Sequence, residues 1–435
     1  MRSLRFAPIF RKALLAAALT CLAAPAVANV ITDWDAKAVA VAAPAPLGQR
    51  ELAMVHVAMF DAVNSIERRY RPYLVQLTAQ KTTSQEAAAA AAAATVLIGL
   101  HPEAAEELKA ALATYLATIA DGEAKSDGIK LGEAVAAKVL QARATDGANA
   151  ADAYRPKTKP GVYVPTPITV ASVWPDLAPF ALAKPSQFRP QPPISLESKE
   201  WAADFNELKA YGGKTSTKRS QQQTETARFW LMVGAPAYHP VPRQLVTAKQ
   251  MSVIDSARFM ALFAVALTDA YIAVFDAKYH YEFWRPITAI RNGDISGNPA
   301  TELDPTWQPI DNTPMHPEYP CAHCIQSGSR RGCHRIRARF RGHPRSFGDQ
   351  LNRPRRHPSL DQPRGVFRRD FERPHLGRVP LPVLDPRRDG YGAPDRCTRR
   401  EERDAAATRD GLTLISASAR LADTGRAEGR RRNGG

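Results

Sequence analysis

The sequence predicts a mostly α-helical protein, and three observations support this prediction. Apolar residues recur at helical spacing in one segment after another, as in 49–70, where Leu52, Val55 and Met59 share one stripe. The alternation of β-branched residues that would indicate strands is scarce throughout. Finally, 44% of the residues are hydrophobic, which is enough apolar side chain to form a substantial core.

Helix start and stop residues place the expected helices along the chain. Ser84 is a suitable N-cap, Pro102 stands where a helix tolerates proline, and Gly122 follows an apolar run. The expected helical segments are 49–70, 84–100, 101–122, 127–147, 195–212, 216–234 and 255–284. Between them, 155–193 holds ten prolines and little periodicity, which predicts a long crossover loop.

Two of the expected helices resemble each other. Segments 52–73 and 260–286 are both apolar, and both end near an Arg-Pro pair. Each also contains an Asp-Ala step, which begins at Asp61 in the first segment and at Asp269 in the second. Two similar helical units packed together would explain this repeat, and chance similarity between apolar helices is the alternative.

The N-terminal segment has the features of a secretory signal peptide. Arg2, Arg5 and Arg11 precede a short apolar run, and Ala26-Val27-Ala28 provides a small-residue cleavage site. We therefore expect three parts: a signal peptide over 1–28, a helical domain over 29–328 and a tail over 329–435. The expected location is outside the cytoplasm, periplasmic or secreted, with no membrane span after the signal is removed.

The tail differs from the rest of the chain in charge and composition. Residues 1–328 carry a net charge of +2, whereas 329–435 carry +14, with 27 Arg and no Lys. Arg- and Pro-rich sequence without apolar periodicity is typical of disorder. A basic tail can bind nucleic acid nonspecifically, but this one has no recognisable nucleic-acid-binding motif. We therefore expect no specific nucleic-acid partner.

Two short segments carry candidate chemistry. In KYHYEFWRP, Lys278 and Arg285 are seven residues apart, which would place both on one helix face before Pro286 ends the helix. A solvated cationic face is the simpler interpretation, but the apolar surroundings favour an anion site that neutralises the two charges. In HPEYPCAH, a turn at Pro320 leads to His323, which could transfer protons near neutral pH.

Together the two segments resemble the motifs of the acid phosphatase and vanadium-dependent haloperoxidase superfamily, which includes the type 2 phosphatidic acid phosphatases. The Lys-x6-Arg-Pro motif is intact, and Pro320-Cys321-Ala322-His323 stands where the family has Pro-Ser-Gly-His. The stretches WRPITAIRNGD, HPEYP and AMVHVAMFDAVN are similar to the soluble bacterial haloperoxidase-like branch. The resemblance covers about 45–328 and implies a helical bundle of this type.

By this resemblance, Lys278 and Arg285 would bind the oxygens of phosphate or vanadate. The backbone at Cys321 and Ala322 would donate N–H groups, and His323 would be the general acid/base. Cys321 in place of serine removes a hydroxyl donor from the site.

The resemblance implies two enzyme activities that share this pocket. A haloperoxidase would hold vanadate as its cofactor and act on peroxide, halide and an organic substrate. A phosphatase would need no cofactor and would hydrolyse a small phosphate ester. An exported helical binding protein is the non-enzymatic alternative.

The third motif of the superfamily, Ser-Arg-x5-His, is not found downstream of Gly328. Its histidine would be the nucleophile or the ligand of vanadium, so the sequence offers no direct metal ligand. Reading 371–386 one nucleotide later permits an Arg-x5-His sequence, and the same shift permits an ordinary helical sequence at 332–338 and a further plausible stretch at 387–397. Three stretches at one shift suggest a frameshift near codon 329. On this hypothesis the tail is out of frame, and the chain as written is impaired in activity.

A zinc site is a further possibility at the same place. Cys321, Cys324, Cys333 and His334 follow the pattern Cys-x2-Cys-x8-Cys-His. This spacing is not that of a standard zinc motif, and adjacent ligands at 333 and 334 fit a tetrahedron poorly. We therefore do not expect bound zinc.

Overall fold

The computed structural model describes residues 29–165, 168–231 and 233–328. Within them the chain is helical, with two isolated β-bridges, Val162 to Phe283 and Gly213 to Pro309, and no named strand. The helices are α2 (Val30–Val41), α3 (Leu47–Glu67), α4 (Gln85–Leu100), α5 (Ala105–Leu116), α6 (Glu123–Arg143), α7 (Lys199–Tyr211), α8 (Gln221–Phe229), α9 (Ala235–Tyr238), α10 (Pro240–Ala248), α11 (Val253–Tyr281) and α12 (Pro286–Arg291). Short 3-10 helices are η1 (Pro102–Ala104), η2 (Trp174–Asp176), η3 (Pro185–Phe188) and η4 (Gly293–Ser296). The predicted mostly α class is confirmed.

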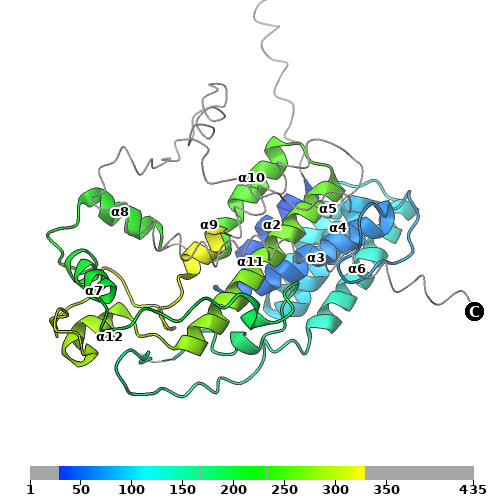
Figure 1. Cartoon of the computed structure of the whole chain (residues 1–435). Helices are drawn as coiled ribbons and strands as arrows, with labels where there is room; N and C mark the ends of the chain where they lie inside the picture. The colour runs from blue at the N-terminus through cyan, green and yellow to red at the C-terminus, as the bar shows by residue number, and fades with distance from the viewer. Residues whose placement is uncertain (1–28, 166–167, 232, 329–435) are drawn as a thin grey trace, which may run out of the picture.

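Helices α2 to α6 pack together, with α11 against α3, and α7 and α12 lie at the other end of α11 (Figure 1). Helix α4 is enclosed by its neighbours, because the eight alanines 87–94 are all buried. Glycine in α6 allows this close approach: a Cβ on Gly132 would stand 2.3 Å from the carbonyl oxygen of Ala88. The alanine run therefore serves as a thin helix between α3 and α6.

Helix α11 positions the candidate site, because Lys278 lies in its last turn. By length and composition it is apolar enough to cross a membrane, the one such helix among the described residues. However, 89% of its apolar window is buried inside the protein. Its hydrophobicity is thus accounted for by packing, against α3 and the loops that carry η2 and η3.

The similarity between the α3 and α11 segments has a structural counterpart. Asp61 of α3 accepts hydrogen bonds from three successive backbone N–H groups, of Tyr73, Leu74 and Val75, at 2.7, 2.7 and 2.9 Å. Asp269 of α11 accepts three from Phe180, Ala181 and Leu182, also at 2.7, 2.7 and 2.9 Å. Both helices end on a left-handed residue, Arg68 and Glu282. In both helices, an aspartate therefore holds a loop through three backbone hydrogen bonds.

The two aspartates differ in how easily water could take the place of the carboxylate as partner of the loop N–H groups. Phe180 and Leu182 are buried, whereas Tyr73 and Leu74 are exposed. We expect Asp269→Ala to cost about 3 kcal/mol in the free energy of unfolding, because it strands buried N–H groups. Asp61→Ala should cost about 1 kcal/mol, since water reaches the freed groups. Urea unfolding of both variants measures the difference, and equal losses would contradict this explanation.

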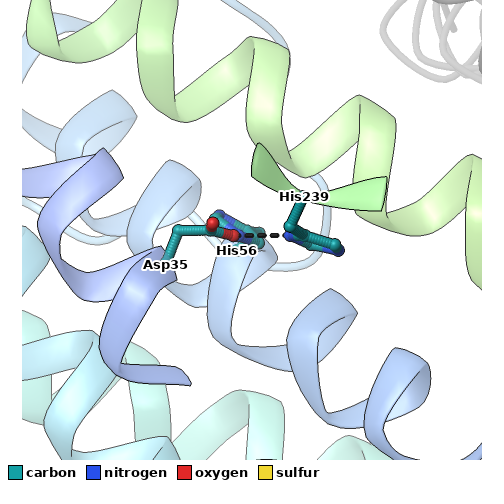
Figure 2. Close-up of side chains that lie close together, drawn as sticks. All are labelled: Asp35, His56 and His239. Atoms are coloured by element: carbon teal, nitrogen blue, oxygen red, sulfur yellow. Dashed lines mark hydrogen bonds and ion pairs between the residues drawn. The ribbon is translucent and has the colours of Figure 1, made fainter. Parts of the chain in front are cut away.

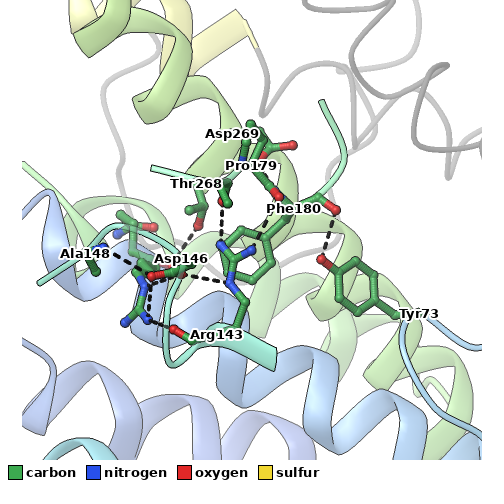
Figure 3. Close-up of polar contacts among 11 residues, drawn as sticks. Tyr73, Arg143, Asp146, Ala148, Pro179, Phe180, Thr268 and Asp269 are labelled. Carbon is green, nitrogen blue, oxygen red and sulfur yellow. Dashed lines mark hydrogen bonds and ion pairs between the residues drawn. The ribbon is translucent and has the colours of Figure 1, made fainter. Parts of the chain in front are cut away.

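A second polar cluster fixes the start of the long loop after α6 (Figure 3). Asp146 accepts two hydrogen bonds from Arg50 of α3, at 2.8 and 3.1 Å, and lies 2.9 Å from Nε of Arg143. The Arg143 guanidinium stacks over the Phe180 ring at 3.7 Å, and the Tyr73 hydroxyl donates to the carbonyl of Phe180. The loop is therefore held to α3, α6 and α11 at once.

The expected helices differ from the observed ones mainly at their ends. The segment 101–122 divides into η1 and α5, and 216–234 contains α8, which ends at Phe229. The predicted crossover over 155–193 is confirmed in its described residues, 155–165 and 168–193, which form a loop with two short 3-10 turns. Helices α2, α9, α10 and α12 were not expected. The predicted signal peptide over 1–28 and the predicted disordered tail over 329–435 lie outside the described residues.

Candidate oxyanion-binding site

Lys278 is a buried cation, with 2% of the residue exposed. Its ammonium donates hydrogen bonds to the backbone carbonyls of Pro317 at 2.8 Å and Glu318 at 2.6 Å. Burial lowers the pKa of Lys278 from 10.5 to about 7, although the nearby Glu318 carboxylate opposes this shift. Near neutral pH both the charged and the neutral form of Lys278 are therefore populated, and a bound anion would favour the charged form.

Arg285 reaches the same loop from a different element, so the prediction that it shares a helix face with Lys278 is wrong. Helix α11 ends at Tyr281, and Glu282 adopts a left-handed conformation with φ of 48°. Arg285 is then the extended N-cap of α12, with φ of −82° and ψ of 154°. Pro286 disfavours a helical conformation for the residue before it, which explains this geometry.

The guanidinium of Arg285 contacts two residues of the facing loop. It donates to the carbonyl oxygen of His316 at 2.6 Å and to the Glu318 carboxylate at 2.5 Å. A third contact joins it to Nδ1 of the His316 ring at 2.8 Å. Burial and the neighbouring Lys278 and Arg285 lower the pKa of His316 to about 2, so its ring is a neutral acceptor.

The loop that carries His323 turns into a helix at Ala322, and 322–328 are helical. Tyr319-Pro320 is a cis peptide bond, and the N–H of Glu318 donates to the carbonyl of Phe283 at 2.9 Å. Cys321 occupies the N-cap position, where its sulfur accepts from the backbone N–H of Cys324 at 3.4 Å. A serine oxygen would make the same cap.

His323 lies close enough to Lys278 to interact with its charge, and one of its ring nitrogens has no hydrogen-bond partner among the described residues. Its ring hydrogen-bonds to the backbone of Trp230, while Nε2 is buried and has no hydrogen-bond partner among the described residues. Burial lowers the pKa of His323, and the positive charge of Lys278 lowers it further. The imidazole is therefore largely neutral at pH 7, and Nε2 is available to take up a proton, after which it could donate to an oxyanion.

The structure thus brings Lys278, Arg285, Cys321, Ala322 and His323 to one place, where α11, the α12 cap and the 316–328 segment meet. Sequence reasoning missed His316 and Glu318 as partners of the cations, although both stand in the quoted HPEYP. It also missed Trp230. Glu318 could have been predicted as a partner of the cations, because it is an acidic residue in the loop expected to meet Lys278 and Arg285.

These residues fit an oxyanion in their donor set. Two cations supply charge, and the ammonium of Lys278 has three protons of which two are used by carbonyls. His323 Nε2 is an unpartnered polar atom in the same site. One carboxylate, Glu318, offsets one cation, so an anion would balance the other. The vanadium-ligating histidine of the resemblance is not among the described residues.

A second group of buried polar residues has the side-chain types of a metal site (Figure 2). Asp35 of α2, His56 of α3 and His239 between α9 and α10 converge, and none of the three side chains is exposed. Asp35 Oδ1 lies 2.7 Å from His56 Nε2 and 2.6 Å from His239 Nδ1. Arg243 donates to Oδ2 at 2.7 Å.

These distances are those of hydrogen bonds. Ligands around tetrahedral zinc, each about 2.0–2.1 Å from the metal, are separated by about 3.3 Å. Burial alone would raise the pKa of Asp35, but His239 and His56 hold it well below its usual value. Burial also lowers the pKa of His56. The group is therefore a buried carboxylate satisfied by three donors, which connects α2, α3 and α10.

The zinc alternative of the sequence analysis gains no support from the described part of the chain. Cys321 and Cys324 are free thiols in contact with each other. Cys333 and His334 lie outside the described residues.

The described chain is thus a helical protein in which two cations, Lys278 and Arg285, meet the loop that carries His323. Residues 258–363 match the family model described as the second helical-bundle domain of vanadium chloroperoxidase. Over 140 residues the chain is 34% identical to the vanadium chloroperoxidase of Curvularia inaequalis. That alignment covers 26% of this chain and 22% of the relative, so it spans only about a fifth of the relative's length.

Solved structures support the same fold. A bacterial vanadium-dependent iodoperoxidase has a TM-score of 0.57 and 22% identity, over 70% of this chain and 79% of the other. An apo-type bacterial vanadium-dependent chloroperoxidase has a TM-score of 0.50 and 17% identity, over 66% and 75% of the two chains. The chain therefore has the helical fold of these bacterial vanadium-dependent haloperoxidases, and its residues 258–363 match a domain of vanadium chloroperoxidase.

Proposed function

We propose that this chain binds phosphate or vanadate in the site of Lys278, Arg285 and His323, as a vanadium-dependent haloperoxidase-like protein. The observation that carries the proposal is the buried Lys278 beside Arg285 and the unpartnered Nε2 of His323. The backbone at Cys321 and Ala322 would add N–H donors. The vanadium haloperoxidases named above favour this branch over the phosphatidic acid phosphatases.

Within this proposal each residue has a distinct task. Lys278 and Arg285 would neutralise the oxyanion, and their carbonyl and carboxylate partners would hold them in place. His323, neutral and fixed by the Trp230 backbone, would take or give a proton at Nε2. When bound, vanadate supplies activation of peroxide for the oxidation of halide, and an organic substrate would be the acceptor.

We further propose that turnover is impaired in the chain as written, because the third motif is not found. The frameshift near codon 329 remains our explanation for its loss. The family-model match ends at residue 363, 35 residues past Gly328. It therefore extends into the segment that the frameshift hypothesis treats as out of frame. Resequencing the DNA on independent clones decides the matter: an in-frame reading through Ser329 would remove the frameshift explanation.

The proposed function is tested first by binding. Vanadate and phosphate at a hundred times their Kd should add about 2.7 kcal/mol to the free energy of unfolding and raise Tm by a few degrees. No change with either anion would contradict the oxyanion site and leave the exported helical binding protein as the alternative.

Turnover then separates the two chemistries. We expect negligible halide oxidation with peroxide, and negligible phosphate ester hydrolysis, from the chain as written. Restoring the reading frame should restore one of them. Ester hydrolysis without halide oxidation would favour the phosphatase alternative. Near-normal turnover of the unrepaired chain would show that the missing motif is not required.

The pH dependence of anion binding follows from Lys278. Its pKa of about 7 is below the value of 10.5 that it has when unfolded. Above pH 7 the ammonium loses its proton, so anion affinity should fall by on the order of tenfold per pH unit. Without anion, the free energy of unfolding should rise between pH 7 and 10, because the unfolded chain binds the extra proton.

Sulfate is the suitable probe for this prediction, because its own charge is constant over this range. Calorimetric titration between pH 6 and 9 measures the affinity. A constant affinity across this range would contradict the assigned role of Lys278.

A further inference from the structure

Two thiols stand on either side of His323, at the entry to the 322–328 helix. Cys321 is the N-cap residue, and its carbonyl accepts from the N–H of Ile325 at 3.3 Å, which closes the first turn. Both the backbone N–H and the thiol of Cys324 hydrogen-bond to the Cys321 sulfur. The two sulfur atoms are therefore in contact in the reduced protein.

The backbone between Cys321 and Cys324 suits a disulfide. Residues three apart on one helical turn have Cα atoms about 5 Å apart, from the helix rise and radius. Disulfides form across Cα separations of about 4.4–6.8 Å. Both cysteines are partly exposed, so a small oxidant can reach them. A bond between them requires only side-chain rotation and a small local adjustment.

The surroundings favour reaction at Cys321 first. The hydrogen bond from the Cys324 thiol lowers the pKa of Cys321 to about 7, and the positive charge of Lys278 contributes, although burial opposes both. A thiolate is the reactive form of cysteine. Cys324, one turn away and touching the first sulfur, is placed to react second.

We propose that Cys321 and Cys324 form a redox-active pair in which hydrogen peroxide oxidises Cys321 and Cys324 resolves the product to a reversible disulfide. The Cys321 thiolate attacks one peroxide oxygen, which gives a sulfenic acid and releases hydroxide. The Cys324 thiol then attacks the sulfenic sulfur, which forms the S–S bond and releases water. In total two thiols and one peroxide give one disulfide and two waters.

The pair protects the oxyanion site from its own oxidant. A sulfenic acid without a neighbouring thiol proceeds to sulfinic acid, which is not reduced by thiols. With Cys324 in contact, the oxidation of Cys321 stops at the disulfide. The presence of peroxide at this site rests on the proposed function, whereas the thiol pair does not.

A single tryptic peptide isolates the two cysteines. Cleavage after Arg291 and Arg330 yields residues 292–330, which contain Cys321 and Cys324 and no other cysteine. After stoichiometric peroxide, this peptide from the full-length folded protein should lose two hydrogens in mass, and dithiothreitol should restore them. An unchanged peptide, or a disulfide joining it to Cys333 or Cys397, would overturn the proposal.

Two variants separate the roles of the cysteines. In Cys324→Ser, the peptide should gain one and then two or three oxygens at Cys321, and dithiothreitol should not reverse the later products. Cys321→Ser keeps an N-cap oxygen and should show at least tenfold slower oxidation of Cys324. Equal oxidation in both variants would overturn the order of reaction. The vanadate-induced change in Tm, measured on reduced protein, tests the proposed function separately.

Discussion

Asp35→Ala is expected to destabilise the protein by about 3–5 kcal/mol, the cost of removing one partner from a buried ionic group. The variant would leave Arg243, His56 and His239 without the carboxylate that satisfies all three. Urea unfolding followed by circular dichroism measures the loss. Domains are typically stable by about 5–15 kcal/mol, so the variant would lose a large share of the free energy of unfolding.

Asp33→Ala is the matched control for this variant. Asp33 lies on the same helix, α2, but is only partly buried. We expect it to cost less than about 1 kcal/mol. A loss as large as that of Asp35→Ala would show that the helix, and not the buried network, carries the effect.

The same network makes a prediction about metal. Because hydrogen bonds alone satisfy Asp35, a chelator should leave the Tm of the purified protein unchanged. A fall in Tm on treatment with EDTA, reversed by zinc, would show that His56 and His239 bind a metal in solution.

Lys278→Met should lower the affinity for vanadate and sulfate by about a hundredfold. The variant removes a buried charge-assisted donor, and such hydrogen bonds contribute about 1.5–3 kcal/mol. Its effect on stability should be smaller than that of Asp35→Ala. The carbonyls of Pro317 and Glu318 lose a donor, but the cost of burying a cation disappears as well.

Lys157→Met controls for the loss of a positive charge near α11. Lys157 pairs with Glu282 at the helix end, and 61% of its side chain is exposed. Its removal should change anion affinity less than twofold, since exposed charges are screened. Calorimetric titration of both variants with vanadate provides the comparison. Similar losses in the two would indicate a general electrostatic effect instead of a site.

The sequence predicts the helices of this fold where their signals are local. Apolar periodicity and the Ser84 cap place α3 and α4 within a few residues of their observed bounds. Helix α10 was missed because Pro240 and Pro242 resemble loop residues, although proline is tolerated in the first turn. Helix α2 was missed because it directly follows the expected signal peptide.

The site was predicted less completely, because its contacts are long-range. Motif spacing brought Lys278, Arg285 and His323 together, but it placed Arg285 on the wrong element. No local pattern indicates that Lys278 donates to the backbone of 317 and 318, or that the Trp230 backbone holds His323. The buried Asp35 group joins residues up to 208 positions apart, and periodicity carries no information about such pairs.

The two aspartate-held loops differ in when they can close during synthesis. Asp61 binds N–H groups that lie 12 to 14 residues later in the sequence. The loop that it holds can therefore close soon after residue 75 leaves the ribosome. Asp269 binds a loop that was made 87 to 89 residues earlier. That loop can bind Asp269 only after α11 has been synthesised as far as residue 269. The loop bound by Asp269, on the helix that carries Lys278, is thus fixed late in synthesis, when most of the described chain has already been made.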